Sequence, residues 1–170
     1  AYEICACLVG SEMCIRDNFG YRSRTFIAPC YTWPASLEKT LRAEGVEALQ
    51  GMIHQCLPGG GHRRHWFGSR NALGQTYLLR NCFFEPTTDA CADPVDACME
   101  RIACAFRWHK PAVISSHRVN YVGFIHPTNR DRSLRLLGEL LDRIRRRWPD
   151  VRFRTSDELT SLLADQKNPT

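Results

Sequence analysis

Residues 111–121 have the sequence Pro-Ala-Val-Ile-Ser-Ser-His-Arg-Val-Asn-Tyr, in which a short apolar run lies between a proline and a polar segment. An apolar run bounded in this way is typical of a strand buried in a parallel sheet. Ligands of α/β proteins bind at the carboxyl ends of such strands. We therefore expect the polar side chains that follow the run, beginning with Ser115-Ser116-His117, to lie at a functional edge of the sheet.

Around this stretch, the chain alternates between strand-like and helix-like patterns. The expected strands are 25–28, 46–53, 76–84, 111–116 and 151–154. The expected helices begin at Pro34, at Asp93, at Asn129 or Asp131, and at the capping box Thr155-Ser156-Asp157-Glu158. Residues 57–74 contain Pro58-Gly59-Gly60-Gly61, which predicts a long loop. The alternation predicts an α/β fold with parallel strands, and both an open sheet and part of a closed barrel fit it.

Three polar segments lie at the carboxyl ends of expected strands: 29–33, 80–85 and 115–121. Because the carboxyl ends of parallel strands meet at one edge of a sheet, we expect these segments to share one face. His117 is the sharpest candidate among them, since an imidazole serves as general acid or base near neutral pH. The alternative is a structural histidine, because a single histidine is a weak signal of function.

Further candidates lie in the same three segments. Glu85 ends the strand that carries Arg80, and its carboxylate is placed to orient a histidine, to bind a sugar hydroxyl or to form a salt bridge with Arg80. Tyr31 and Trp33 offer aromatic faces for stacking on sugar rings, with packing at the rim of the sheet as the alternative.

Other site types are disfavoured. His62 and His65, with His54 upstream, have a spacing that binds metals, but Arg63 and Arg64 between them would repel a cation, so no metal site is assigned to this chain. The chain contains neither a GxxxxGK[ST] phosphate loop nor a GxSxG motif. No apolar run approaches the roughly 18 to 20 residues of a membrane span.

Arginine contributes much of the net charge of +5, notably in the run Arg143, Arg145, Arg146 and Arg147. We interpret this run as the solvated face of a helix. A nucleic-acid partner is not expected, because Trp148 falls on the apolar stripe of that helix instead of among exposed basic residues. The nine cysteines include no CxxC pair, which favours mostly reduced thiols.

The two ends of the chain are set apart from the fold. Residues 1–17 sustain neither strand nor helix periodicity, and 7–17 resemble translated sequencing adapter, so we exclude them from the argument. Residues 18–166 are expected to form one partial barrel domain, and 167–170 a tail.

Several segments together resemble the C-terminal half of bacterial polysaccharide deacetylase-like proteins, in the glycoside hydrolase/deacetylase β/α-barrel superfamily. The segments are Phe26-Ile27-Ala28-Pro29-Cys30-Tyr31-Thr32-Trp33, Arg80-Asn81-Cys82-Phe83-Phe84-Glu85-Pro86, residues 108–121, and Trp148-Pro149-Asp150-Val151. The resemblance implies that the chain is the C-terminal part of a (β/α)7-type barrel with parallel strands, and that a polysaccharide or oligosaccharide is its substrate.

The resemblance also implies roles for individual residues. His117 matches the late strand-end histidine that serves as general acid toward the leaving group. Arg80, Arg118 and Asn120 are expected to bind sugar. Residues 28–31 resemble the family's Arg-x-Pro-Tyr motif in part, since Ile27 replaces the arginine and Cys30 separates proline from tyrosine.

In this family an aspartate pair and a His-x3-His motif hold a divalent, zinc-like metal, and neither motif occurs among these 170 residues. The metal is therefore expected only in a full-length parent, and this chain alone is expected to be inactive. Two alternatives within the superfamily stay open, a glycosidase-type barrel in which Glu85 joins a carboxylate pair and a barrel that only binds glycan.

Overall fold

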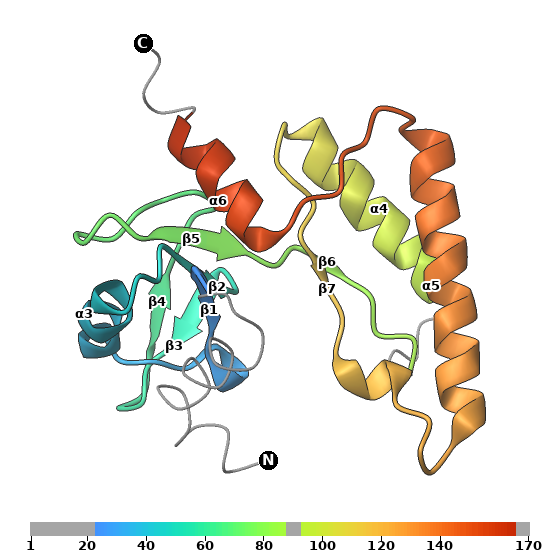
Figure 1. Ribbon diagram of the computed structural model, residues 1–170, viewed down its shortest axis with the longest axis horizontal. Helices are drawn as coiled ribbons and strands as arrows, with labels where there is room; N and C mark the ends of the chain where they lie inside the picture. Colours follow the sequence, from blue (N-terminus) through green and yellow to red (C-terminus); the bar gives the residue numbers. More distant parts are fainter. Residues whose placement is uncertain (1–22, 88–92, 166–170) are drawn as a thin grey trace. The chain divides into compact units, whose positions relative to one another are not determined.

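The structure, a computed structural model, describes residues 23–87 and 93–165, which divide into two compact units (Figure 1). Unit 1 combines the described residues up to Leu79 with those from Arg154 onward, and unit 2 extends from Arg80 to Phe153. Each unit has its own core of buried apolar side chains. Residues 1–17, which we excluded from the predicted domain, and the predicted tail 167–170 lie outside the described residues.

Unit 1 is built on a three-stranded parallel sheet with the strand order β1-β2-β5. Its elements are β1 (Thr25–Ile27), the 3-10 helix η1 (Pro29–Tyr31), α3 (Ala35–Ala43), β2 (Ala48–Gly51), β3 (His54–Cys56), β4 (His62–Arg64), β5 (Thr76–Leu79) and α6 (Ser156–Asp165). Leu49 of the central strand lies between Phe26 and Tyr77, and Leu41 of α3 packs into the same cluster. The predicted helix after Pro34 is confirmed, and it stops before Gly45, which adopts a positive φ of 86°.

The glycine-rich segment 57–74 is not the plain loop that its composition predicted. It supplies β4, which pairs antiparallel with β3, so that Cys56 lies opposite His62 and His54 opposite Arg64. Gly60 and Gly61, with φ of 90° and 84°, allow the chain to reverse between the two strands. The prediction was wrong because all three residues of β4 are exposed, which leaves no apolar alternation to identify a strand.

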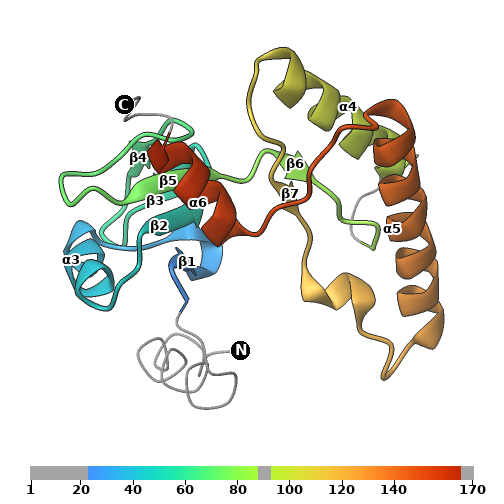
Figure 2. The same cartoon turned by 45° about the horizontal axis from the view of Figure 1, so that its top comes forward.

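Unit 2 places two helices against a two-stranded parallel sheet. Its elements are β6 (Cys82–Phe83), α4 (Pro94–Arg107), β7 (Ile114–Ser115), the 3-10 helix η2 (Arg118–Tyr121) and α5 (Pro127–Arg147). Cys82 lies opposite Ile114. The helices α4 and α5 lie side by side in both views, and Ile102 and Leu140 bury completely between them and the sheet (Figures 1 and 2).

The predicted strand 76–84 is in fact two strands that belong to different units. The chain leaves β5 at Leu79 and enters β6 at Cys82. Between them, the Asn81 side chain accepts a hydrogen bond from the Val113 amide at 2.7 Å and donates one to the Pro111 carbonyl at 3.0 Å. These side-chain bonds add to the backbone bonds that the amides of Asn81 and Cys82 donate to the Val113 carbonyl, at 3.3 and 3.1 Å. The uninterrupted β-prone sequence did not indicate this change of partner strand.

Two further boundaries differ from the prediction. The helix expected to begin at Asn129 or Asp131 begins at Pro127, whose missing N–H suits the first helical turn. Residues 151–154 form no strand, because the Val151 amide turns back to the Trp148 carbonyl at 3.0 Å.

Two helix caps agree with the sequence. The Asp93 carboxylate accepts from the amides of Val95 and Asp96 at 2.8 and 3.1 Å, as its N-cap position predicted. Thr155 and Glu158 exchange the two hydrogen bonds of a capping box, at 2.8 and 3.2 Å.

The predicted α/β class with parallel strands is confirmed for the described residues. Their strands form open sheets and do not close into a barrel. Within the described ranges, no helix has both the length and the apolar character needed to cross a bilayer.

Candidate functional site

The structure brings Glu85 and His117 together at the carboxyl ends of β6 and β7. Glu85 follows β6 and His117 follows β7, and the two strands are parallel neighbours. Nδ1 of His117 lies 2.8 Å from Oε1 of Glu85, and the backbone amide of His117 donates to the same oxygen at 3.1 Å. The histidine ring and its main chain are thus both held by one carboxylate.

The exposure of the pair leaves one ring nitrogen available. The His117 side chain is 65% exposed, whereas that of Glu85 is 16% exposed. Because Nδ1 faces Glu85, Nε2 is the nitrogen directed to the surroundings, and it has no hydrogen-bond partner among the described residues. A carboxylate that accepts from Nδ1–H fixes the orientation of the ring, as in proton-transfer sites.

Asn120 lies behind this pair instead of at the surface where a sugar would bind. Its side chain is fully buried, and Nδ2 donates to Oε2 of Glu85 at 2.7 Å and to the His117 carbonyl at 2.9 Å. Its Oδ1 accepts from the Thr87 amide at 3.1 Å. The substrate contact expected of Asn120 is therefore not available in this structure, because burial withdraws the side chain from any ligand.

The other expected sugar-binding residues are divided between the units. Arg118 is exposed in η2 directly after His117, and Arg80 is half-buried before β6. Tyr31 and Trp33 belong to unit 1. Of the three strand-end segments, the structure brings 80–85 and 115–121 together in unit 2, while 29–33 lies in the other unit.

Trp33 packs in the core of unit 1 and offers no ring face for stacking. It is 2% exposed, and its Nε1 donates to Oε1 of Glu38 at 3.2 Å. Trp33 therefore has a packing role instead of the sugar-stacking role. Tyr31 is half-buried, and its backbone lies in the left-handed region with φ of 54°.

A second polar cluster, around Glu38 in unit 1, was missed on sequence. Glu38 is 4% exposed, and its carboxylate accepts from the Tyr77 hydroxyl and from Asn71 Nδ2, both at 2.9 Å, as well as from Trp33. Arg63 lies 3.9 Å away. Burial is the main cause that raises the pKa of Tyr77. Since the carboxylate is enclosed and fully partnered, we interpret this cluster as a structural anchor of unit 1.

His65, one of the histidines considered for a metal, is enclosed next to this cluster. Its Nε2 is 2.7 Å from Oε1 of Gln55, and its ring stacks on Tyr77 with centroids 3.7 Å apart. Burial lowers the pKa of His65, assisted by the charge of Arg63. Within 23–87 and 93–165, no group of three or more histidine, cysteine, aspartate or glutamate side chains is arranged to hold a metal ion.

The buried thiols of unit 2 are poorly suited to nucleophilic chemistry. Burial raises the pKa of Cys82 to about 12 and that of Cys98 to about 11. The thiolate is the reactive form of cysteine, so neither side chain is activated as a nucleophile.

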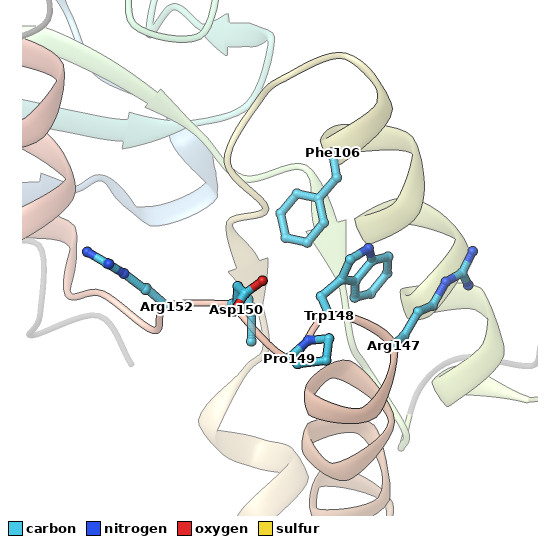
Figure 3. Close-up of a pocket in the computed structure, with 7 residues that line it drawn as sticks. Phe106, Arg147, Trp148, Pro149, Asp150 and Arg152 are labelled. Carbon is cyan, nitrogen blue, oxygen red and sulfur yellow. The ribbon is translucent and has the colours of Figure 1, made fainter.

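A cavity of about 440 Å³ lies at the end of α5, and the two arginines that line it do not converge. Phe106 and Trp148 form its aromatic wall, in an edge-to-face contact with centroids 5.0 Å apart. The side chains of Arg147 and Arg152 extend to opposite sides of the view, away from each other (Figure 3). Ligand sites combine apolar walls with a few convergent polar groups, so the Glu85–His117 pair is the better candidate.

Comparisons with protein-family models, with curated proteins and with solved structures found no match for this chain.

Proposed function

We propose that His117 is the general acid of a polysaccharide deacetylase-like carbohydrate hydrolase that acts on acetylated polysaccharide or oligosaccharide. We also propose that the parallel strands of this chain belong to the C-terminal part of a (β/α)7-type barrel. The observation that supports the proposal most is the 2.8 Å contact of Glu85 with Nδ1 of His117, which leaves Nε2 free to face a substrate.

The chemistry assigned to His117 is protonation of the leaving group. Water adds to the acetyl carbonyl and releases a proton to the solvent. The C–N or C–O bond to the sugar then breaks, acetate leaves, and the electron pair of that bond passes to the sugar nitrogen or oxygen. The imidazolium donates its Nε2 proton to that atom and becomes the neutral ring that keeps the proton on Nδ1. Glu85 supports both forms, because its carboxylate accepts from Nδ1–H throughout.

The position of Glu85 favours this assignment over a glycosidase. A glycosidase needs a carboxylate that faces the sugar as nucleophile, acid or base. Both oxygens of Glu85 are engaged inside the protein, Oε1 by His117 and Oε2 by Asn120. Glu85 is therefore assigned as the residue that orients His117, and the exposed Arg118 as the side chain in η2 that contacts substrate.

The described residues do not fit the divalent metal that the family resemblance implies. At the candidate site only Glu85 and His117 are possible metal ligands, and they bind each other. Zinc sites use three or four protein ligands with a supporting shell, and no such group occurs among the described residues. The proposal therefore assigns no step to a metal in this chain, and it concerns the acid alone.

The test is acetate release from N-acetylated and O-acetylated oligosaccharides by the full-length protein. We expect His117→Gln to lower kcat about 100-fold or more, the contribution typical of a general acid. The matched control is His126→Gln, since His126 is an exposed histidine of the same unit at the start of α5. Unchanged acetate release by His117→Gln, or no release by the wild type, would contradict the proposal.

A further inference from the structure

Asn120 occupies a position from which it controls the Glu85–His117 pair without contacting substrate. We infer that Asn120 is a positioning residue, which holds the Glu85 carboxylate in the one orientation that keeps the proton of neutral His117 on Nδ1. The inference rests on the proposed acid role of His117, to which it adds the residue that sets the state of the ring.

The amide nitrogen of Asn120 binds one carboxylate oxygen of Glu85 and leaves the other for His117. Nδ2 of Asn120 donates to Oε2 of Glu85 at 2.7 Å, and this leaves Oε1 to face Nδ1 of His117 at 2.8 Å. The same Nδ2 donates to the His117 carbonyl at 2.9 Å. One amide group therefore fixes the Glu85 carboxylate relative to the main chain of His117.

The acceptor side ties the pair to the chain beyond β6. Oδ1 of Asn120 accepts from the Thr87 amide at 3.1 Å, two residues after Glu85. The amide side chain provides a donor and an acceptor at these two places, whereas a carboxylate lacks the donor and an apolar side chain lacks both. Because Asn120 is completely buried, its donor and its acceptor find their partners within the protein.

The consequence for His117 is a fixed tautomer. In a neutral imidazole one nitrogen carries the proton, and the hydrogen bond made by one nitrogen decides the state of the other. With Glu85 held by Asn120, the neutral ring keeps its proton on Nδ1 and has its lone pair on Nε2. Nε2 then takes up a new proton before each turnover. Without Asn120 the carboxylate keeps the bond from the His117 amide but loses the donor that fixes Oε2, so we expect it to turn away from Nδ1 part of the time and both tautomers to become populated.

The test is long-range 1H–15N NMR of the histidine rings in the complete chain, at about pH 9, where ordinary imidazoles are neutral. We expect wild-type His117 to be mainly the Nδ1–H tautomer, with its signals assigned by their loss in His117→Gln. Asn120→Leu, which retains side-chain volume, and Asn120→Ala should both shift His117 to a tautomer mixture like that in Glu85→Ala.

The matched control is Asn129→Leu. Asn129 also contacts Thr87, through the Thr87 hydroxyl at 3.1 Å, and it lies in α5 away from the carboxylate. The control should keep the wild-type tautomer. Amide spectra of each variant establish that it is folded. If Asn120→Leu disturbs the fold, the tautomer of His117 in Asn120→Ala decides whether Asn120 positions Glu85.

The outcomes separate this inference from the proposed function. A wild-type His117 that is not mainly Nδ1–H would overturn the inference whatever the variants do, as would a folded Asn120 variant with the wild-type tautomer. Conversely, an Nδ1–H tautomer lost on substitution of Asn120, in a full-length protein that releases no acetate, would sustain the positioning role and refute the hydrolase proposal.

Discussion

Removal of the Glu38 carboxylate should destabilise unit 1, because this single side chain accepts from three donors. Glu38→Ala leaves the Trp33 indole N–H and the Tyr77 hydroxyl without their acceptor, and both residues are almost fully buried, at 2% and 3% exposure. Asn71 loses less, since its Nδ2 still donates to Gln75 at 2.8 Å.

The expected magnitude follows from these two buried donors. A buried donor without a partner costs about 1–3 kcal/mol, which gives roughly 2–6 kcal/mol for the pair. Part of this is offset because the variant no longer buries a carboxylate, so we expect a loss of about 2–4 kcal/mol. That is a large share of the roughly 5–15 kcal/mol by which a domain is stable.

Urea unfolding followed by tryptophan fluorescence measures this loss as a lower midpoint at unchanged slope. Glu38→Gln should lose less, since its carbonyl oxygen still accepts from Trp33 and Tyr77. The matched control is Glu44→Ala at the end of the same helix, which should stay within about 0.5 kcal/mol of the wild type. If Glu38→Ala also unfolded within about 0.5 kcal/mol of the wild type, the assignment of a structural anchor would be refuted.

Three further outcomes are expected. Burial lowers the pKa of His65, so the imidazole binds a proton more readily in the unfolded chain than in the folded one. Thermal stability should therefore fall as pH drops below about 6.5, and His65→Phe should flatten this dependence. Asp93→Ala should destabilise unit 2 by about 1 kcal/mol through loss of the α4 cap, whereas Asp93→Asn should retain most of it, as denaturant midpoints would report. Gly123→Ala should lower the thermal midpoint, because a Cβ there would lie 2.9 Å from Cβ of Arg130; an unchanged midpoint would contradict the close packing of this turn.

Part of the candidate site was predictable from the sequence. The apolar run before Ser115 indicated a parallel strand, and the rule that functional groups gather at carboxyl strand ends placed His117 and Glu85 at one edge. Their contact in the structure agrees with one of the roles considered for Glu85, orientation of a histidine. The function built on this contact stays a proposal until acetate release is measured.

The sequence was misleading where a residue's type suggested the surface but its surroundings placed it inside. Asn120 and Trp33 were expected to meet sugar, and both are buried, one behind Glu85 and the other against Glu38. Nothing in the local pattern distinguishes an amide that binds a ligand from one that binds a carboxylate of the same protein. The exposed strand β4 was missed for the complementary reason, that no side chain in it is buried.

The sequence by itself determined the helices, two of their caps and the α/β alternation. These depend on residues within a few positions of one another: apolar spacing, the Asp93 cap and the capping box at Thr155. Only the tertiary structure decided which polar side chains meet. Glu85 and Asn120 are 35 positions apart and Glu38 and Tyr77 are 39 apart. Contacts over such separations carry no periodic signal, since they arise only when packed strands and helices bring distant segments together and burial makes an unpaired polar group costly.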